Sequence, residues 1–275
     1  MTRIALFQSQ TGIDPGQNAR NLVDAIATAA EGGAEMLFTP EMSGMLDRDT
    51  QRARGNLRAE GEDLVLAACR EAAKAHGIWL HIGSLAVLAD DGKVANRGFV
   101  IDREGPVRAH YDKIHLFDVD LPTGESWRES STYSAGQGVA LVNGTPVGKV
   151  GLTICYDLRF PSLFARLAEA GADVLSVPAA FTVPTGRAHW HVLLRARAIE
   201  AGLFVVAAAQ AGRHEDGRQT FGHSLVVDPW GEVLLDMGEE PGVGYADIDL
   251  ARITDVRSRI PALSHRRPIP EAVTR

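Results

Sequence analysis

Cys155 is the residue of this sequence best suited to covalent chemistry. It follows a short apolar run, residues 150–154, that predicts a buried strand, and Pro161 then begins a segment with apolar residues at helical spacing. We therefore expect the thiol in a strand-to-helix turn, where open α/β sheets bind ligands and where a helix start favours a thiolate. The alternative is an inert core cysteine, because cysteine is among the residue types most often buried.

Glu41 and Lys113 are predicted to lie in the same kind of position, each just past the end of a strand. A cysteine nucleophile needs a base that takes its proton and a cation that stabilises the charge developing on the attacked carbonyl oxygen. These two side chains supply both functions. The alternatives are that Glu41 is a solvated loop carboxylate and that Lys113 pairs with Asp112 or Asp118 at the surface.

Three motifs surround these residues: TPEMS at 39–43, YDKIHLFDVDLPTGESWRESSTYSAG at 111–136, and GKVGLTICYDLRFP at 148–161. In order and spacing they resemble the carbon-nitrogen hydrolase, or nitrilase-like, superfamily, and the resemblance covers nearly the whole chain. It implies that Glu41 is the general base, Lys113 the transition-state stabiliser and Cys155 the nucleophile. It also implies that Glu129, in WRES, positions Lys113 and the substrate.

The resemblance extends to the branch of the superfamily. Cys155-Tyr156-Asp157 is similar to the omega-amidase type, whereas nitrile hydrolases typically carry Cys-Trp-Glu. Residues 181–233 resemble the amidases of deaminated glutathione, although Arg187 and His191 replace their usual Pro and Glu. The implied activity is hydrolysis of the carboxamide of a small keto-acid amide through a thioester. Deaminated glutathione is the first candidate substrate, 2-oxoglutaramate is the alternative, and a non-catalytic binding or signalling protein on the same fold is the alternative of another class.

Tyr156, Arg159, Arg187 and His189 are predicted to bind the substrate. Arg159, four residues after the nucleophile, suits a substrate carboxylate because a guanidinium can hold one through two hydrogen bonds. The alternative for Arg159 is a structural salt bridge to Asp157 or to a nearby helix. Arg187 would add a second cation.

The sequence predicts neither a metal nor an organic cofactor. His189 and His191 are two residues apart on a predicted helix, so their side chains point in different directions and do not suit a shared zinc ion. The implied amide chemistry requires no cofactor for any step.

Composition narrows the class of protein and its partners. The 275 residues include 45% hydrophobic and 23% charged residues, and the net charge of -7 argues against nucleic acid as a partner. Apolar runs such as residues 203–209 are far shorter than a membrane span requires, and the N-terminal segment reads as a strand, not as a signal peptide. Two cysteines form no disulfide framework. We therefore expect a cytoplasmic protein.

Alternating strand and helix patterns are predicted along most of the chain. Two β-strands, 96–102 and 107–112, are expected to pair across Glu104-Gly105, which would make the middle of the sheet partly antiparallel, and Asp90-Asp91-Gly92 marks a further turn. Residues 113–138 read as a long aperiodic loop. The other expected strands are 3–8, 36–39, 78–83, 150–154, 174–177, 203–209, 225–227, 233–235 and 244–248, and the expected helices are 18–31, 62–76, 161–171 and 188–201.

The superfamily resemblance implies an α/β fold, a four-layer α-β-β-α sandwich. We find no repeat or linker, so residues 1–275 are expected to form a single domain. We expect a homo-oligomer with a dimer as its unit, paired through the helix after Cys155 and the helix that carries Trp190. The tail, residues 260–275, has no core-forming pattern and is expected to lie at the oligomer interface.

Overall fold

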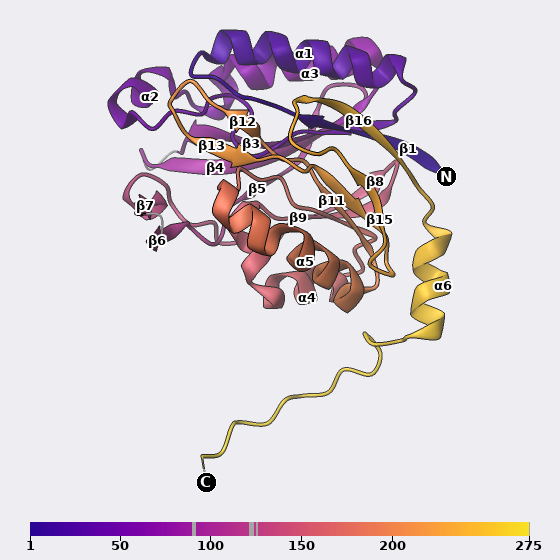
Figure 1. Ribbon diagram of the computed structural model, residues 1–275. Helices are drawn as coiled ribbons and strands as arrows, with labels where there is room; N and C mark the ends of the chain where they lie inside the picture. The colour runs from indigo at the N-terminus through magenta and orange to yellow at the C-terminus, as the bar shows by residue number, and fades with distance from the viewer. Residues whose placement is uncertain (90–91, 121–123, 125, 275) are drawn as a thin grey trace.

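The computed structural model describes residues 1–89, 92–120, 124 and 126–274. The expected turn at Asp90-Asp91 lies outside the described residues. Two six-stranded sheets pack face to face, with helices covering the outer face of each (Figure 1). The four-layer α-β-β-α sandwich expected from the superfamily resemblance is therefore confirmed.

The first sheet has the strand order β16-β1-β2-β3-β4-β5. The strands β1, β2 and β3 are parallel, and the remaining pairings are antiparallel. The predicted pair of strands is confirmed as β4 and β5, but it forms one edge of the sheet, so the expectation of an antiparallel middle was wrong. The bounds are β1 (Thr2–Gln8), β2 (Met36–Phe38), β3 (Trp79–Leu88), β4 (Val94–Ile101), β5 (Val107–Asp112) and β16 (Gly242–Ile248).

The second sheet repeats this plan with the order β15-β14-β11-β10-β9-β8. Here β9, β10 and β11 are parallel, and antiparallel strands flank them on both sides. The bounds are β8 (Leu141–Thr145), β9 (Gly148–Leu152), β10 (Val174–Ser176), β11 (Phe204–Ala207), β14 (Leu225–Val227) and β15 (Val233–Asp236).

Strand alternation explains how one sheet serves two cores. In β1, Ile4 and Leu6 belong to the core between the two sheets, whereas Ala5 faces the core beneath α1 (Pro15–Glu31) and α3 (Leu64–His76). On the opposite outer face lie α4 (Pro161–Glu169) and α5 (Val183–Ala201) (Figure 1). A residue period of two therefore gives every strand of this kind a helix-facing and a sheet-facing side.

Helix ends follow local capping chemistry. The Asp14 side chain accepts a hydrogen bond from the backbone N–H of Gly16, and Pro15 is the first helical residue, so α1 begins before the predicted residue 18. Helix α5 begins at Val183 rather than at residue 188. It ends at Gly202, whose φ of 57° is in the left-handed region that glycine adopts without steric cost.

Several short elements were not predicted. Helix α2 (Thr50–Asn56) buries no residue, and α6 (Ala251–Arg259) buries two, so neither has the broad apolar stripe that makes a helix visible in sequence. Within the region expected to be an aperiodic loop, β6 (Asp118–Asp120) pairs with β7 (Ser126–Arg128). The remaining elements are β12 (Ala211–Arg213), β13 (Gln219–Phe221) and the 3-10 helices η1 (Glu60–Glu62), η2 (Glu129–Ser131) and η3 (Cys155–Arg159).

The first residues after α6 still pack on the sandwich, where Leu263 contacts the core and Arg266 pairs with Glu169 of α4. The chain beyond them extends away from the sandwich (Figure 1). Ile269 and Val273 in this tail are 93% and 78% exposed. In the described part of the chain, no helix combines the length and the apolar character needed to cross a membrane.

Candidate active site

Glu41, Lys113 and Cys155 meet in one cavity of about 430 Å³, which Glu129 also lines. Glu41 follows β2, Lys113 follows β5 directly, and Cys155 follows β9. Two antiparallel steps from β3 to β5 restore the strand direction, so β2 and β5 end at the same edge of the first sheet. The two sheets thus bring three residues that are distant in sequence to one place.

Cys155 lies at a sharp turn between β9 and α4, as predicted. Its φ is 50°, a left-handed conformation that costs a non-glycine residue roughly 1 kcal/mol or more. The backbone N–H of Cys155 donates to the Pro178 carbonyl at 2.8 Å, and the Asp157 carboxylate accepts from the Ile154 N–H at 2.9 Å. These bonds hold the strained residue where its side chain lines the cavity.

A second strained residue, Met42, adjoins Glu41. Its φ is 57°, and its backbone N–H donates to Ser84 Oγ at 2.9 Å. The Glu41 carboxylate itself accepts the backbone N–H of Ala180 at 3.0 Å. Cys155 and Glu41 are therefore both held in place by hydrogen bonds to the backbone of residues 178–180, which follow β10.

Lys113 forms the centre of a buried charged network. Its Nζ lies 2.9 Å from Glu41 Oε1, and 2.8 and 3.1 Å from the two carboxylate oxygens of Glu129. Asn96 Nδ2 donates to both glutamates, at 3.0 and 3.1 Å. The side chains of Lys113 and Glu41 are only 2% and 6% exposed, so a solvated Glu41 is excluded.

The surface pairing considered for Lys113 is also excluded by the arrangement of its neighbours. Asp112 instead forms a two-pronged ion pair with Arg97, at 2.6 and 2.8 Å. The Asp118 carboxylate accepts hydrogen bonds from Ser130. Lys113 therefore directs its charge inward, into the cavity.

The electrostatics of the network favour a neutral thiol beside a charged carboxylate. Burial and the adjacent Glu41 carboxylate raise the pKa of the Cys155 thiol well above its usual value. Burial alone would raise the pKa of Glu41 and lower that of Lys113. The Lys113 ammonium instead lowers the pKa of Glu41, and the carboxylates of Glu129 and Glu41 raise the pKa of Lys113.

The expectation that a helix start would favour a resting thiolate was therefore wrong. Cys155 begins the short η3, not the longer α4, and the Glu41 carboxylate adds to burial in raising the pKa of its thiol. A second negative charge in this buried space would be repelled. The arrangement suits proton transfer from thiol to Glu41 during attack.

Asp157 organises the loop that carries Lys113, a role that no pattern in the sequence indicates. Its fully buried carboxylate accepts from Tyr111 Oη at 2.7 Å and from the His115 backbone N–H at 3.1 Å, and lies 2.7 Å from His115 Nδ1. Tyr111 and His115 flank Lys113 in the chain. The aspartate thus ties the lysine segment to the turn that holds Cys155.

Among the residues predicted to bind substrate, Tyr156 and Arg159 line the cavity. In the described part of the chain no carboxylate pairs with Arg159, and Asp157 is committed to other partners, so the salt bridge considered between these two is excluded. Arg159 Nη2 lies 3.2 Å from His189 Nδ1. His189 therefore contacts a cavity-lining residue but does not line the cavity itself. Arg187 is exposed on α5 and does not line the cavity either.

Further arginines at the cavity were not predicted. Arg48 and Arg218 place their guanidinium carbons 4.6 and 5.2 Å from the ring centre of Trp127. Arg128 also lines the cavity and pairs with Asp120. These arginines reach the cavity from loops that come together only in the folded chain. Motif spacing in the sequence therefore did not indicate them.

Comparison with known proteins identifies related chains. A family model described as carbon-nitrogen hydrolase matches residues 3–258. A deaminated glutathione amidase of Bos taurus is 41% identical over 96% of this chain and 82% of its own length.

Solved structures agree with this relationship. The Caenorhabditis elegans NitFhit protein is 39% identical and superposes with a TM-score of 0.89. The match covers 97% of this chain and 65% of the NitFhit chain. A mutant amidase from Nesterenkonia sp. AN1, 29% identical, superposes with a TM-score of 0.79 over 95% of this chain and 98% of its own. That structure shows acrylamide added to its active-site cysteine.

Proposed function

Because the chain belongs to the carbon-nitrogen hydrolase family, we propose that Cys155, Glu41, Lys113 and Glu129 hydrolyse the carboxamide of a small keto-acid amide through a thioester. The protein is a hydrolase that acts on amides. The observation that carries the proposal for these residues is the buried network in which Lys113 contacts both glutamates at the cavity that Cys155 lines.

In the first step Glu41 takes the thiol proton while the Cys155 sulfur attacks the amide carbon. The carbonyl oxygen becomes an oxyanion, which Lys113 and the backbone N–H of Tyr156 stabilise. Tyr156 is near the start of η3, where backbone N–H groups have no acceptor within the helix. Because the proton neutralises Glu41 as the oxyanion forms, the total charge of the cavity is unchanged, and negative charge moves towards the substrate.

In the second step the tetrahedral intermediate breaks its carbon–nitrogen bond, and ammonia leaves with the proton from Glu41. The acyl group remains on Cys155 as a thioester. Glu41 then removes a proton from water as the water oxygen attacks the thioester carbon. Cleavage of the carbon–sulfur bond, with return of that proton to sulfur, releases the acid and restores the thiol. Glu129 holds Lys113 throughout.

For the substrate we favour deaminated glutathione, with 2-oxoglutaramate as the alternative. The 41% identical relative carries the name of the first activity, and a cavity of about 430 Å³ is large enough for an extended small substrate. An anionic substrate that approaches a protein of net charge -7 also needs local cations. Arg159, which pairs with no carboxylate among the described residues, would supply one at the cavity.

An assay of ammonia release tests the function. The panel contains deaminated glutathione, 2-oxoglutaramate, a neutral aliphatic amide and a nitrile, and Cys155→Ala is the control. We expect the keto-acid amides to give the highest kcat/KM and the control to be inactive. Preference for neutral amides or nitriles would contradict the substrate proposal. Ammonia release by the wild type that does not exceed the background seen with Cys155→Ala would favour a binding or signalling protein.

We further propose that residues 1–275 form one domain that assembles as a homodimer through α4 and α5. On or near α5 the exposed apolar side chains include Val192, Ile199 and Trp230, which are 61%, 53% and 51% exposed. The tail would gain order by crossing the partner. Light scattering at micromolar concentration should give twice the chain mass, or a multiple of that dimer mass, and a monomer would refute the proposal.

A cytoplasmic location is part of the same proposal, because the nucleophilic thiol must stay reduced and both cysteines are free. Fractionation of cells that express the full chain should recover it with cytoplasmic marker enzymes. Recovery in an oxidising compartment would contradict this location.

A further inference from the structure

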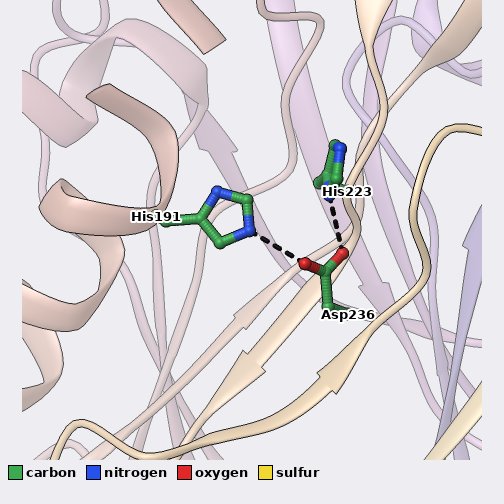
Figure 2. Close-up of side chains that lie close together, drawn as sticks. All are labelled: His191, His223 and Asp236. Atoms are coloured by element: carbon green, nitrogen blue, oxygen red, sulfur yellow. Dashed lines mark hydrogen bonds and ion pairs between the residues drawn. The ribbon is translucent and has the colours of Figure 1, made fainter. Parts of the chain in front are cut away.

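His191, His223 and Asp236 form a cluster that the amidase proposal does not use (Figure 2). The three residues come from α5, from the bend between β13 and β14, and from the end of β15. None of them lines the active-site cavity. His191 Nε2 lies 2.9 Å from Asp236 Oδ2, and His223 Nδ1 lies 2.8 Å from Asp236 Oδ1. Both imidazoles therefore point to the same carboxylate.

The donor set and its spacing suit a transition-metal ion. One ligand atom from each residue lies within 4.8 Å of the others. Tetrahedral zinc, at about 2.0–2.2 Å from imidazole nitrogen and carboxylate oxygen, needs ligand atoms about 3.3 Å apart. Small side-chain rotations bridge that difference. The side chains of His191, His223 and Asp236 are 37%, 21% and 34% exposed, which leaves access for a water ligand.

The backbone fixes the ligands relative to one another. Trp190, the neighbour of His191, donates its indole N–H to the carbonyl of His223 at 2.8 Å. His223 has a φ of 54°, and its backbone N–H donates to the Gly238 carbonyl. The Gly238 N–H in turn orients the Asp236 carboxylate at 3.0 Å. In metal sites, hydrogen bonds of this kind to the ligand residues keep the ligands oriented towards the ion.

The arrangement of donors around Asp236 also suits a cation. Both imidazoles and the Gly238 backbone N–H face its carboxylate, so an ion bound between the two rings would contact that carboxylate directly. A neutral imidazole coordinates through the nitrogen that lacks the proton. A tautomer change at each ring, with proton exchange through water, would free His191 Nε2 and His223 Nδ1 for the metal.

We propose that His191, His223 and Asp236 bind one divalent transition-metal ion of the zinc class, with water completing its coordination. The ion would join α5 to β15 and to the bend before β14. The prediction that His189 and His191 do not share a metal considered only two residues of one helix. The proposed partners of His191 come from other elements, and His189 is not one of them.

Cobalt binding tests the proposal without any readout of amidase activity. Co²⁺ is titrated into untagged, metal-free full-length Cys155→Ala protein, a background that removes the cavity thiol as a competing ligand. We expect visible d–d absorption that saturates at one equivalent per chain and is displaced by Zn²⁺. Absence of binding at equimolar concentrations would overturn the proposal, and it would leave the amidase proposal unaffected.

Variants in the same background locate the ion. His191→Ala, His223→Asn and Asp236→Asn should each weaken binding by about 100-fold or more, whereas His76→Ala, at an exposed position on α3, should not. Asparagine at 223 tolerates the left-handed backbone, and Asp236→Asn keeps the side-chain shape. Circular dichroism and light scattering check folding and assembly. Binding equal to the parent in all three variants would also overturn the proposal.

Discussion

Lys113 Nζ lies 2.9 Å from Glu41 Oε1, and this buried contact joins residues that are 72 positions apart in the chain. Lys113 also contacts Glu129, so one ammonium compensates two carboxylates. Burial and the Glu41 carboxylate raise the pKa of the Cys155 thiol, and Lys113 offsets only part of that rise. The proposed nucleophile therefore rests as a thiol, and a base must act during attack.

Glu41→Gln should lower kcat/KM by about 10²- to 10⁴-fold, because the variant has no base for the thiol proton. The same change removes a negative charge next to the sulfur, so the pKa of Cys155 should fall. Steady-state ammonia release and pH titration of thiolate absorbance measure the two effects. Glu169→Gln, an exposed control, should change neither. Full activity in Glu41→Gln would rule out its role as base.

Limiting iodoacetamide should alkylate Cys155 in preference to Cys69. Burial, and secondarily Asp63, raise the pKa of Cys69 to about 12, and its side chain is fully inaccessible in α3. Cys155 also has a raised pKa, but it lines the cavity and has Glu41 beside it. Peptide mass spectrometry of the native protein locates the label. Preferential labelling of Cys69 would count against the proposed nucleophile.

Arg159→Ala should lower kcat/KM for keto-acid amides by about 30- to 1000-fold, equivalent to roughly 2 to 4 kcal/mol for a lost charged hydrogen-bond partner. Neutral aliphatic amides should be affected much less. Arg187→Ala is the matched control, because Arg187 is exposed outside the cavity lining. An equal loss on charged and neutral amides would mean that Arg159 is structural.

Tyr111→Phe should reduce the free energy of unfolding by about 2 kcal/mol, because it removes a buried hydrogen bond of 2.7 Å to the Asp157 carboxylate. Tyr245→Phe removes an exposed hydrogen bond to the Thr28 carbonyl and should cost about 0.5 kcal/mol. Urea denaturation compares the two variants. A smaller loss for Tyr111→Phe than for Tyr245→Phe would show that Asp157 does not anchor this loop.

His81 should make the fold less stable as the pH falls. Burial lowers the pKa of His81 from 6.5 to about 3, so between these values the unfolded chain binds a proton that the folded chain excludes. This contribution is fully present above pH 6.5 and is lost towards pH 3. From pH 7 to pH 5 the expected loss is about 2 kcal/mol.

The His81→Gln variant tests that origin. Urea denaturation at pH 7 and pH 5 should show a difference in unfolding free energy that is smaller than the wild-type difference by about 2 kcal/mol. An unchanged difference would assign the acid sensitivity to other groups.

Local patterns predicted most of the framework. Apolar runs and helix stop signals located the four long helices and every strand of the two six-stranded sheets except β8. They did so because burial imposes a period of two or of about 3.6 residues on the sequence. Motif resemblance supplied the fold and the proposed roles of Glu41, Lys113, Glu129 and Cys155. Helix α2 and the β6–β7 pair escaped prediction because they bury little apolar surface.

Tertiary structure decided which groups meet and in which charge state. Asn96 bridges the two glutamates from a strand whose pattern indicates only burial, and Asp157 reaches Tyr111 across 46 residues. His191 finds His223 and Asp236 on other elements. Sequence periodicity reports which face of an element is buried. It does not report the distances between side chains on different elements or the polarity around them. These distances and surroundings determine that the Cys155 side chain rests as a protonated thiol.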